Sequence, residues 1–520
     1  MKSYKFGLLI LLITLVLVGC GSSDDEGSSG GDNNSSGNSV LKIAIDAPPP
    51  TLDQPVSTAT SARDASRFIF EGLLTTDSEF QAVPMLAESV DTEDNKTYTF
   101  KLREGIKFHN GEEMTAEDVV ASMYRWMEQS TVTGNVFNDA TWTADGDYTV
   151  ILELANPSSL TLDTLASAKQ AAGIMPKEIV ENAPASGVEE YIGTGPYKFV
   201  EWKQDQYIHY TKFEDYQPLD TPADGLSGKK EALIDDIYLY IVTDTSTRIA
   251  GLQTGEYDFA YGIPYDYYGQ INGDENLETI LTPAANQMIG FNNLEGIATD
   301  AKVRQAINMA INNEEVMMAA FPNPEFFWLD SGYMDRDIVN WYTEAGSEHY
   351  NQADIEGAKK LLEESDYNGE EVRFLATRDY DHHYNTSLVV TEQLKEIGLN
   401  VKLEIYDWPT VLDIQGNQPS EWEMYMTSAS TVSTPPQLIG LSPRFGGVYP
   451  EVSDLISEIE TAPTQEEAFE YWDELQGKLW EEYLPIVNLG GYNTLYGHNK
   501  KVEGIETLTG PIFWNVSINE

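Results

Sequence analysis

One helix that runs directly into a strand, between residues 388 and 405, constrains the fold more than any other segment. Leu388–Ile397 predicts a helix that Gly398 ends, and Val401, Leu403 and Ile405 then alternate as in a half-buried strand. A helix that passes through a glycine into a strand is typical of α/β folds. We therefore expect an α/β protein.

Other segments fit the same interpretation. Val40–Ile45 and Thr97–Leu102 predict strands, and Lys302–Ile311 has the apolar spacing of an amphipathic helix. Thr115 followed by Asp118 is the pattern of a capping box at the start of another helix. Because 520 residues are too many for one ordinary core, we expect two or three lobes.

The charge and the cysteine content exclude several classes of function. The chain has 31 Lys and Arg against 85 Asp and Glu, a net charge of −54. This charge argues against a nucleic-acid partner and against electrostatic binding to anionic lipid. One cysteine cannot form an internal disulfide, a Cys-based zinc site or an iron–sulfur cluster. We expect no cofactor.

The N-terminus predicts export and a lipid anchor. Lys2 and Lys5 precede the apolar run Phe6–Val18, which is typical of a signal peptide and short for a membrane span. Leu17 to Cys20 resembles the lipobox of bacterial lipoproteins, although a signal anchor with an incidental cysteine is the alternative. We expect a signal peptide at 1–19, lipidation of Cys20 and a flexible tether at 20–39. The folded part then lies at the extracellular face of the cell membrane, or on the periplasmic side in a cell with two membranes.

Several motifs, in order along the chain, resemble the bacterial extracellular solute-binding proteins of family 5, the dipeptide- and oligopeptide-type receptors of ABC importers. The motifs are Tyr98–Gly111, Thr115–Val120, Gly193–Phe199, Arg248–Asp258, Phe291–Asn293 with Val303–Ala306, and Phe513–Val516. Two of them, Tyr98–Gly111 and Gly193–Tyr197, contain turn residues that explain their composition without any ligand.

The resemblance implies a periplasmic-binding-protein-like type II fold, with two lobes around a ligand cleft and an extra domain inserted in the first lobe. The first lobe is then built from 40–72, 191–286 and 490–520, the inserted domain from 73–190, and the second lobe from 287–489. Connections near Asn286 and Leu489 form the hinge. The implied partners are a small peptide-like solute and an ABC permease with its ATPase, and we expect a monomer that binds and releases its solute without a catalytic step.

The resemblance also implies ligand contacts. Arg378 and Tyr380 stand where the family has an arginine for the ligand carboxylate and a nearby tyrosine, and a guanidinium fork suits a carboxylate. Trp408 matches a tryptophan that lines the pocket, and Ser430 with Thr431 forms a hydroxyl cluster. The structural alternatives are a surface arginine, a core tryptophan and an ordinary polar loop.

One position departs from the family pattern. Peptide-type receptors carry an aspartate there that pairs with the ligand's ammonium group, whereas this chain has Thr431. No carboxylate lies between Glu423 and Pro435. Either another acid substitutes, or the solute is neutral at that end, such as a blocked peptide, an opine-like conjugate or a sugar.

Two other functions are alternatives. His382-His383 suggests a nickel complex, but adjacent side chains diverge and rarely chelate one ion together, so we expect no metal site. A secreted hydrolase with two carboxylates is the second alternative, and the sequence has neither Gly-x-Ser-x-Gly nor His-Glu-x-x-His.

Overall fold

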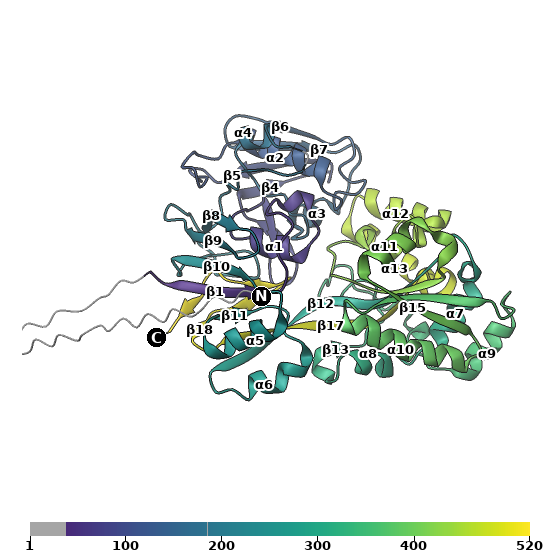
Figure 1. The fold of residues 1–520 in the computed structure, drawn as a ribbon. Helices are drawn as coiled ribbons and strands as arrows, with labels where there is room; N and C mark the ends of the chain where they lie inside the picture. The colour runs from purple at the N-terminus through teal and green to yellow at the C-terminus, as the bar shows by residue number, and fades with distance from the viewer. Residues whose placement is uncertain (1–37, 185, 520) are drawn as a thin grey trace, which may run out of the picture. The chain divides into compact units, whose positions relative to one another are not determined.

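The computed structural model describes residues 38–184 and 186–519 (Figure 1). The predicted signal peptide, Cys20 and the tether up to residue 37 lie outside these described residues. One compact unit begins at Ser39 and contains all the helices and strands described below. Within the described ranges, no helix is both long and apolar enough to cross a membrane.

A mixed sheet of eleven strands runs through this unit. Parallel pairs lie at two places, where β1 pairs with β10 and β11, and where β14 pairs with β15 and β16. In sheet order the strands are β15 (Asn400–Tyr406), β14 (Glu371–Thr377), β16 (Met424–Ala429), β12 (Leu277–Phe291), β17 (Ile486–Asn499), β11 (Phe259–Ala260), β1 (Val40–Ile45), β10 (Asp236–Ile241), β9 (Tyr207–Lys212) and β8 (Tyr197–Lys203), and β13 (Phe327–Trp328) pairs with β17.

The long antiparallel strands β12 and β17 connect the two halves of this sheet. Near its end, β17 pairs with β11 of one half, and the last residues of β12 pair with β16 of the other. The register between β12 and β17 shifts twice, between Pro283 and Ala285 and between Gln287 and Met288. Such irregularities interrupt ladder bonds and bend the strand, which places the weakest part of the connection beside Asn286.

Parallel strands alternate with helices in the half that contains β14. Here β14 leads through α10 (Asp381–Glu396) to β15, and α11 (Trp408–Asn417) leads on to β16. The helix-to-strand prediction is confirmed, but α10 begins seven residues before Leu388, so His382 and His383 lie in its first turn. Figure 1 shows two groups of helices on either side of this half: α7 (Ala301–Ala310), α8 (Asn313–Ala320) and α9 (Ile355–Glu363) with α10, and α12 (Pro450–Thr461) and α13 (Gln465–Lys478) with α11.

The other half carries short helices and an additional sheet. This sheet has four strands in the order β4 (Ala87–Asp91), β5 (Thr97–Leu102), β7 (Thr149–Glu153) and β6 (Thr141–Ala144). Thr115 and Asp118 form the predicted capping box of α2 (Ala116–Gln129). The remaining helices are α1 (Thr60–Ser66), α3 (Thr161–Ala166), α4 (Lys177–Glu181), α5 (Thr245–Thr254) and α6 (Tyr268–Asn272), and the paired short strands are β2 (Leu74–Thr76) with β3 (Ala82–Pro84), β18 (Val502–Glu503) with β21 (Ser517–Ile518), and β19 (Glu506–Thr507) with β20 (Pro511–Ile512).

Three main hydrophobic cores divide the unit, and we keep the names first lobe, inserted domain and second lobe for the ranges predicted from the sequence. One core lies within Leu73–Ile174, and a second combines β1 with distant residues such as Phe513 and Val516. The third core surrounds β14, β16 and the end of β12. Met175, Val180 and Val188, which fall in the range of the inserted domain, pack in the core of the first lobe.

The motif Gly193–Tyr197 serves close packing. A Cβ on Gly193 would lie 2.2 Å from the carbonyl oxygen of Ile69, and one on Gly195 would lie 2.5 Å from that of Phe68. Neither residue tolerates a side chain without movement of the backbone, which explains both glycines structurally.

Candidate functional site

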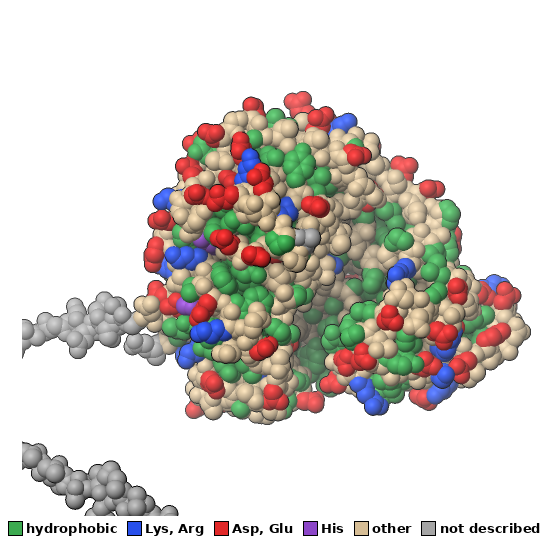
Figure 2. Space-filling view, turned by 45° about the horizontal axis from the view of Figure 1, so that its top comes forward, with side chains coloured by type: hydrophobic (Ala, Val, Ile, Leu, Met, Phe, Trp, Pro, Cys, Tyr) green, Lys and Arg blue, Asp and Glu red, His purple; other side chains and the backbone are tan. Residues whose placement is uncertain are grey.

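A cavity of about 720 Å³ is bordered by all three parts of the unit. The first lobe contributes Arg63 and Asp64 of α1, the inserted domain contributes Lys169, and the second lobe contributes the segments that follow β14, β15 and β16. Figure 2 shows a hollow with hydrophobic side chains along its walls, while acidic side chains are spread over the outer surface. Among the residues that border the cavity only Asp46 and Asp64 are acidic, so the strong negative charge of the chain is not concentrated there.

Four of the five predicted contact residues border this cavity: Tyr380, Trp408, Ser430 and Thr431. They follow the carboxyl ends of three neighbouring parallel strands, where the side chains of α/β proteins converge. The rings of Tyr380 and Trp408 meet edge to face, with centroids 5.7 Å apart. Tyr380 is 42% exposed, which is high for a large ring and leaves its surface open to a ligand.

Hydrogen bonds to the backbone at the start of α11 hold Trp408 in position. Its N–H donates to Asp379 Oδ2 at 2.7 Å, and Asp407 caps the helix that Trp408 begins. An aromatic ring held in this way offers contact area with little loss of side-chain entropy.

Arg378, the fifth predicted residue, lies outside this cavity. Its Nη2 donates to the hydroxyl of Tyr384 at 2.9 Å, and its guanidinium carbon is 4.7 Å from the centroid of the same ring. The side chain is exposed and turned toward the first turn of α10.

A different arginine faces the cavity. Arg63 Nε donates to Asp64 Oδ1 at 2.8 Å, and Arg67 pairs with the same oxygen at 3.1 Å. Among the described residues, neither Nη atom of Arg63 has a hydrogen-bond partner. Two guanidinium groups thus share one carboxylate, which leaves positive charge at the cavity wall. No local motif around Arg63 identifies it as a candidate ligand contact, because the residues that border the cavity are distant from one another in the chain.

Two histidines of α10 pack against the rings of Tyr380 and Trp408. His382 and His383 have ring centroids 4.5 Å apart, and the ring of Tyr492 lies tilted against that of His382, with centroids 5.1 Å apart. Burial lowers the pKa of His382 to about 4 and that of His383 to about 2, so both rings are neutral at pH 7. Within the described ranges, no group of three or more His, Cys, Asp or Glu side chains could hold a metal ion.

Thr431 contacts an acid that the sequence did not reveal. Its hydroxyl donates to Asp335 Oδ2 at 2.6 Å, although the two residues are 96 positions apart. Burial raises the pKa of Asp335 above its ordinary value. Although the loop after β16 contains no carboxylate of its own, Asp335 places one beside it.

The inserted domain also touches the second lobe directly. Trp341 Nε1 donates to Asp163 Oδ2 at 3.4 Å, and Asn135 Nδ2 donates to Glu460 Oε2 at 2.7 Å. Burial raises the pKa of Asp163 to about 6. Leu160 of the inserted domain also belongs to the core of the second lobe, so apolar as well as polar contacts join the two parts.

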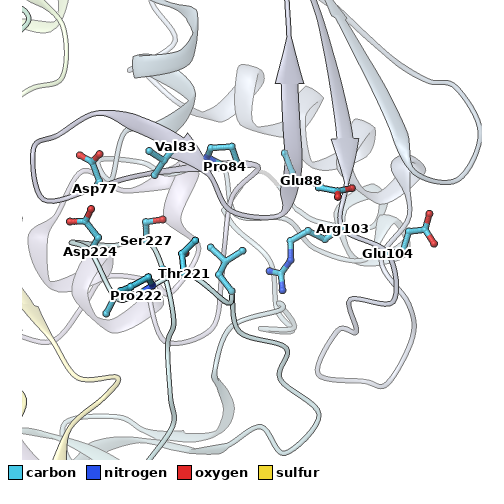
Figure 3. Close-up of a pocket in the computed structure, with 14 residues that line it drawn as sticks. Asp77, Val83, Pro84, Glu88, Arg103, Glu104, Thr221, Pro222, Asp224 and Ser227 are labelled. Atoms are coloured by element: carbon cyan, nitrogen blue, oxygen red, sulfur yellow. The ribbon is translucent and has the colours of Figure 1, made fainter.

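Another cavity, of about 1000 Å³, lies between the inserted domain and residues 219–228 of the first lobe. Figure 3 shows Asp77 and Asp224 close together, Glu104 at the far side and Arg103 between them. Arg103 already donates to the carbonyl oxygens of Met85, Gln217 and Pro218. This cavity has no wall from the second lobe.

Two lobes joined by two long strands, with a cavity bordered by both, are the arrangement of a protein that encloses a small ligand. A family model described as "Bacterial extracellular solute-binding proteins, family 5 Middle" matches residues 81–443. Because this match covers more than half of the chain, the chain belongs to that family.

Curated relatives and a solved structure agree with the family. The probable peptide ABC transporter periplasmic-binding protein y4tO of Sinorhizobium fredii is 28% identical over 491 residues, 89% of this chain and 91% of the relative. The glutathione-binding protein GsiB of Pectobacterium atrosepticum is 27% identical over 91% of this chain and 92% of its own length. The structure of AgaA from A. tumefaciens R10 in complex with agropinic acid matches with a TM-score of 0.72 at 25% identity, over 92% of this chain and 99% of AgaA.

These findings confirm the predicted family and the α/β binding-protein fold. The protein is a solute-binding protein and not an enzyme, as expected. It is of the periplasmic or extracellular kind, which agrees with the coarser part of the predicted location.

Proposed function

We propose that this protein is the receptor of an ABC importer and that it captures a peptide or peptide-like solute in the cavity between its lobes. The observation that carries the proposal is that one cavity is bordered by the ends of β14, β15 and β16 in the second lobe and by α1 in the first. A solute that contacts both walls favours the arrangement in which the lobes approach each other, because it binds that arrangement more tightly. The permease and its ATPase would receive the solute from this state.

The solute class is supported by the chemistry of the walls. Tyr380 and Trp408 offer flat apolar area, Ser430 offers a hydroxyl, and Arg63 offers an unoccupied guanidinium edge. Aromatic area with a few polar anchors suits a peptide, whose bulk is apolar and whose groups are polar. The peptide, glutathione and agropinic acid named for the relatives are all of this mixed kind.

A non-peptide solute remains the second candidate, and it is favoured by the hydroxyls of Ser428, Ser430 and Thr431 at one end of the cavity. A sugar or an opine-like conjugate would use such hydroxyls without needing a charged partner there.

We propose further that the chain is cleaved before Cys20 and that Cys20 is acylated, so that the receptor is tethered at the outer face of the membrane. The support is the lipobox-like Leu17–Cys20 sequence before a Gly- and Ser-rich stretch. The intact mass of the exported chain measures this, and a mass without acyl chains contradicts it.

The test of the proposed function is binding of defined probes to the purified full chain. The panel contains di- to pentapeptides with free termini, glutathione, agropinic acid and a set of oligosaccharides. A peptide present at 100 times its Kd should stabilise the folded state by about 2.7 kcal/mol, visible as a higher melting temperature. Calorimetry should then give one site per chain, with the peptide recovered unchanged. Stabilisation by oligosaccharides alone would favour the second candidate, and no stabilisation by any probe would contradict the receptor function.

A further inference from the structure

Asp335 is a buried acid whose contacts are incomplete. The side chain is 7% exposed, and the hydroxyl of Thr431 is bonded to Oδ2. The other oxygen, Oδ1, is buried and has no hydrogen-bond partner among the described residues. No ion pair to Asp335 is found in the same part of the chain, although Arg336 is the next residue.

Two other buried acids of this protein have the charged hydrogen-bond donors that a structural carboxylate needs. Asp53 binds Arg125 with both oxygens and accepts the backbone N–H of Val188. Asp64 is shared by Arg63 and Arg67. Asp335, in contrast, has one neutral donor for a group that needs several when it is ionised and removed from water. The free-energy cost of burying this carboxylate is therefore not compensated by contacts with the surrounding protein.

The position of Asp335 shows from which side a hydrogen-bond donor could reach Oδ1. The residue borders a small cavity of about 20 Å³ beside Asn286 and Ser430, which is room for about one water molecule. It also borders a larger cavity of about 570 Å³ that Arg63, Ser430 and Thr431 line as well. A group of the solute that enters between the lobes thus reaches the neighbourhood of this carboxylate.

The chemistry of the missing partner follows from these contacts. An ionised carboxylate with one donor accepts best from a group that brings positive charge and several N–H donors together, which a hydroxyl or an amide does not. We propose that Asp335, held in place by Thr431, is the subsite for a protonated amine of the solute. This assignment rests on the proposed function and adds to it that the solute carries a cationic nitrogen at the end that lies toward the loop after β16.

The test compares a peptide with its blocked form. The probes are the tightest-binding peptide of the panel and the same peptide N-acetylated, titrated into the purified full chain by calorimetry. Wild type should bind the free amine at least tenfold more tightly than the acetylated form. Asp335→Asn should remove most of this preference while the acetylated peptide binds with nearly unchanged Kd. Asp454→Asn takes the same charge from an exposed position of α12 that borders none of these cavities, and it should keep the preference.

Two outcomes overturn the assignment alone: equal Kd values of the two peptides for wild type, or a preference that survives in Asp335→Asn. Failure of every panel member to bind would instead contradict the proposed function. In that case the melting temperature of the ligand-free protein still tests whether Asp335 has a structural role. If the carboxylate serves a solute, Asp335→Asn should melt no lower than wild type at pH 7, because it removes an unpaired buried charge. A clearly lower melting temperature would mean a structural role and would overturn the subsite.

Discussion

Arg125→Ala should destabilise the protein by about 3–5 kcal/mol, the largest effect on stability that we expect from the loss of a single ion pair. Arg125 lies on α2 of the inserted domain and donates to both oxygens of Asp53 in the first lobe, one of them at 3.0 Å. Asp53 is fully buried. Without Arg125 its charge keeps only the backbone N–H of Val188 at 2.8 Å, so an uncompensated ion remains inside the protein.

The matched control is Lys177→Ala. Lys177 pairs with Glu117 of α2 at 3.1 Å, but both side chains are exposed, so its loss should leave the free energy of unfolding nearly unchanged. Urea unfolding of the three proteins measures the difference in the free energy of unfolding. Equal midpoints for Arg125→Ala and wild type would contradict the view that this buried pair attaches the inserted domain to the first lobe.

Arg63→Gln should weaken binding of a peptide with a free carboxylate by about 10- to 100-fold. The reason is that the free Nη edge of Arg63 is the positively charged donor that borders both cavities of the cleft. Loss of a hydrogen bond to a charged group costs about 1.5–3 kcal/mol, which corresponds to this change in Kd. The same peptide with an amidated C-terminus should bind wild type and Arg63→Gln about equally.

Arg378→Gln is the control for this experiment, because it removes the same charge from the arginine that resemblance to the family predicted. Its side chain is exposed and stacks on Tyr384, so we expect less than a twofold change. Calorimetry with the free and the amidated peptide distinguishes the two arginines. A large loss in Arg378→Gln and none in Arg63→Gln would show that the carboxylate is bound at the end of β14 instead.

The predicted residues that border the cavity came mainly from the resemblance to the family. Tyr380, Trp408 and Thr431 each follow one of three parallel strands, of which only β15 was predicted from its own residues. Strand ends that share an edge of a sheet must bring such residues together. The fold class could be predicted from the sequence because it depends on a local helix-to-strand pattern.

Arg63 and Asp335, which we propose contact the solute, were missed because they reach the cavity through contacts between distant segments. Arg63 sits in a helix of seven residues in the first lobe, and Asp335 lies in an irregular stretch between β13 and α9. Neither position has a motif, and the chain contains 85 acids from which one buried carboxylate could not be selected. The absence of an acid near Thr431 was visible in the sequence, but the hydrogen bond from Thr431 to Asp335, 96 residues away, was not.

The boundary of α10 shows a smaller difference of the same kind. The apolar pattern suggested a start at Leu388, whereas the helix begins at Asp381 and includes the polar residues between them. Thr386 and Ser387 are fully buried and satisfy their hydroxyls on carbonyl oxygens of the preceding turn, and His383 is buried as well. These buried polar residues conceal the helix from a search for apolar periodicity.

The central claim is that a solute binds between the lobes and draws them together about the irregular part of β12 and β17. Small-angle X-ray scattering of the purified full chain tests this most directly, with and without the tightest-binding peptide at a concentration that calorimetry shows to be saturating. Closure on the solute predicts a smaller radius of gyration in the presence of the peptide, and no change for a variant that carries both Arg63→Gln and Asp335→Asn at the same peptide concentration. An identical radius of gyration for wild type with and without saturating peptide would contradict it.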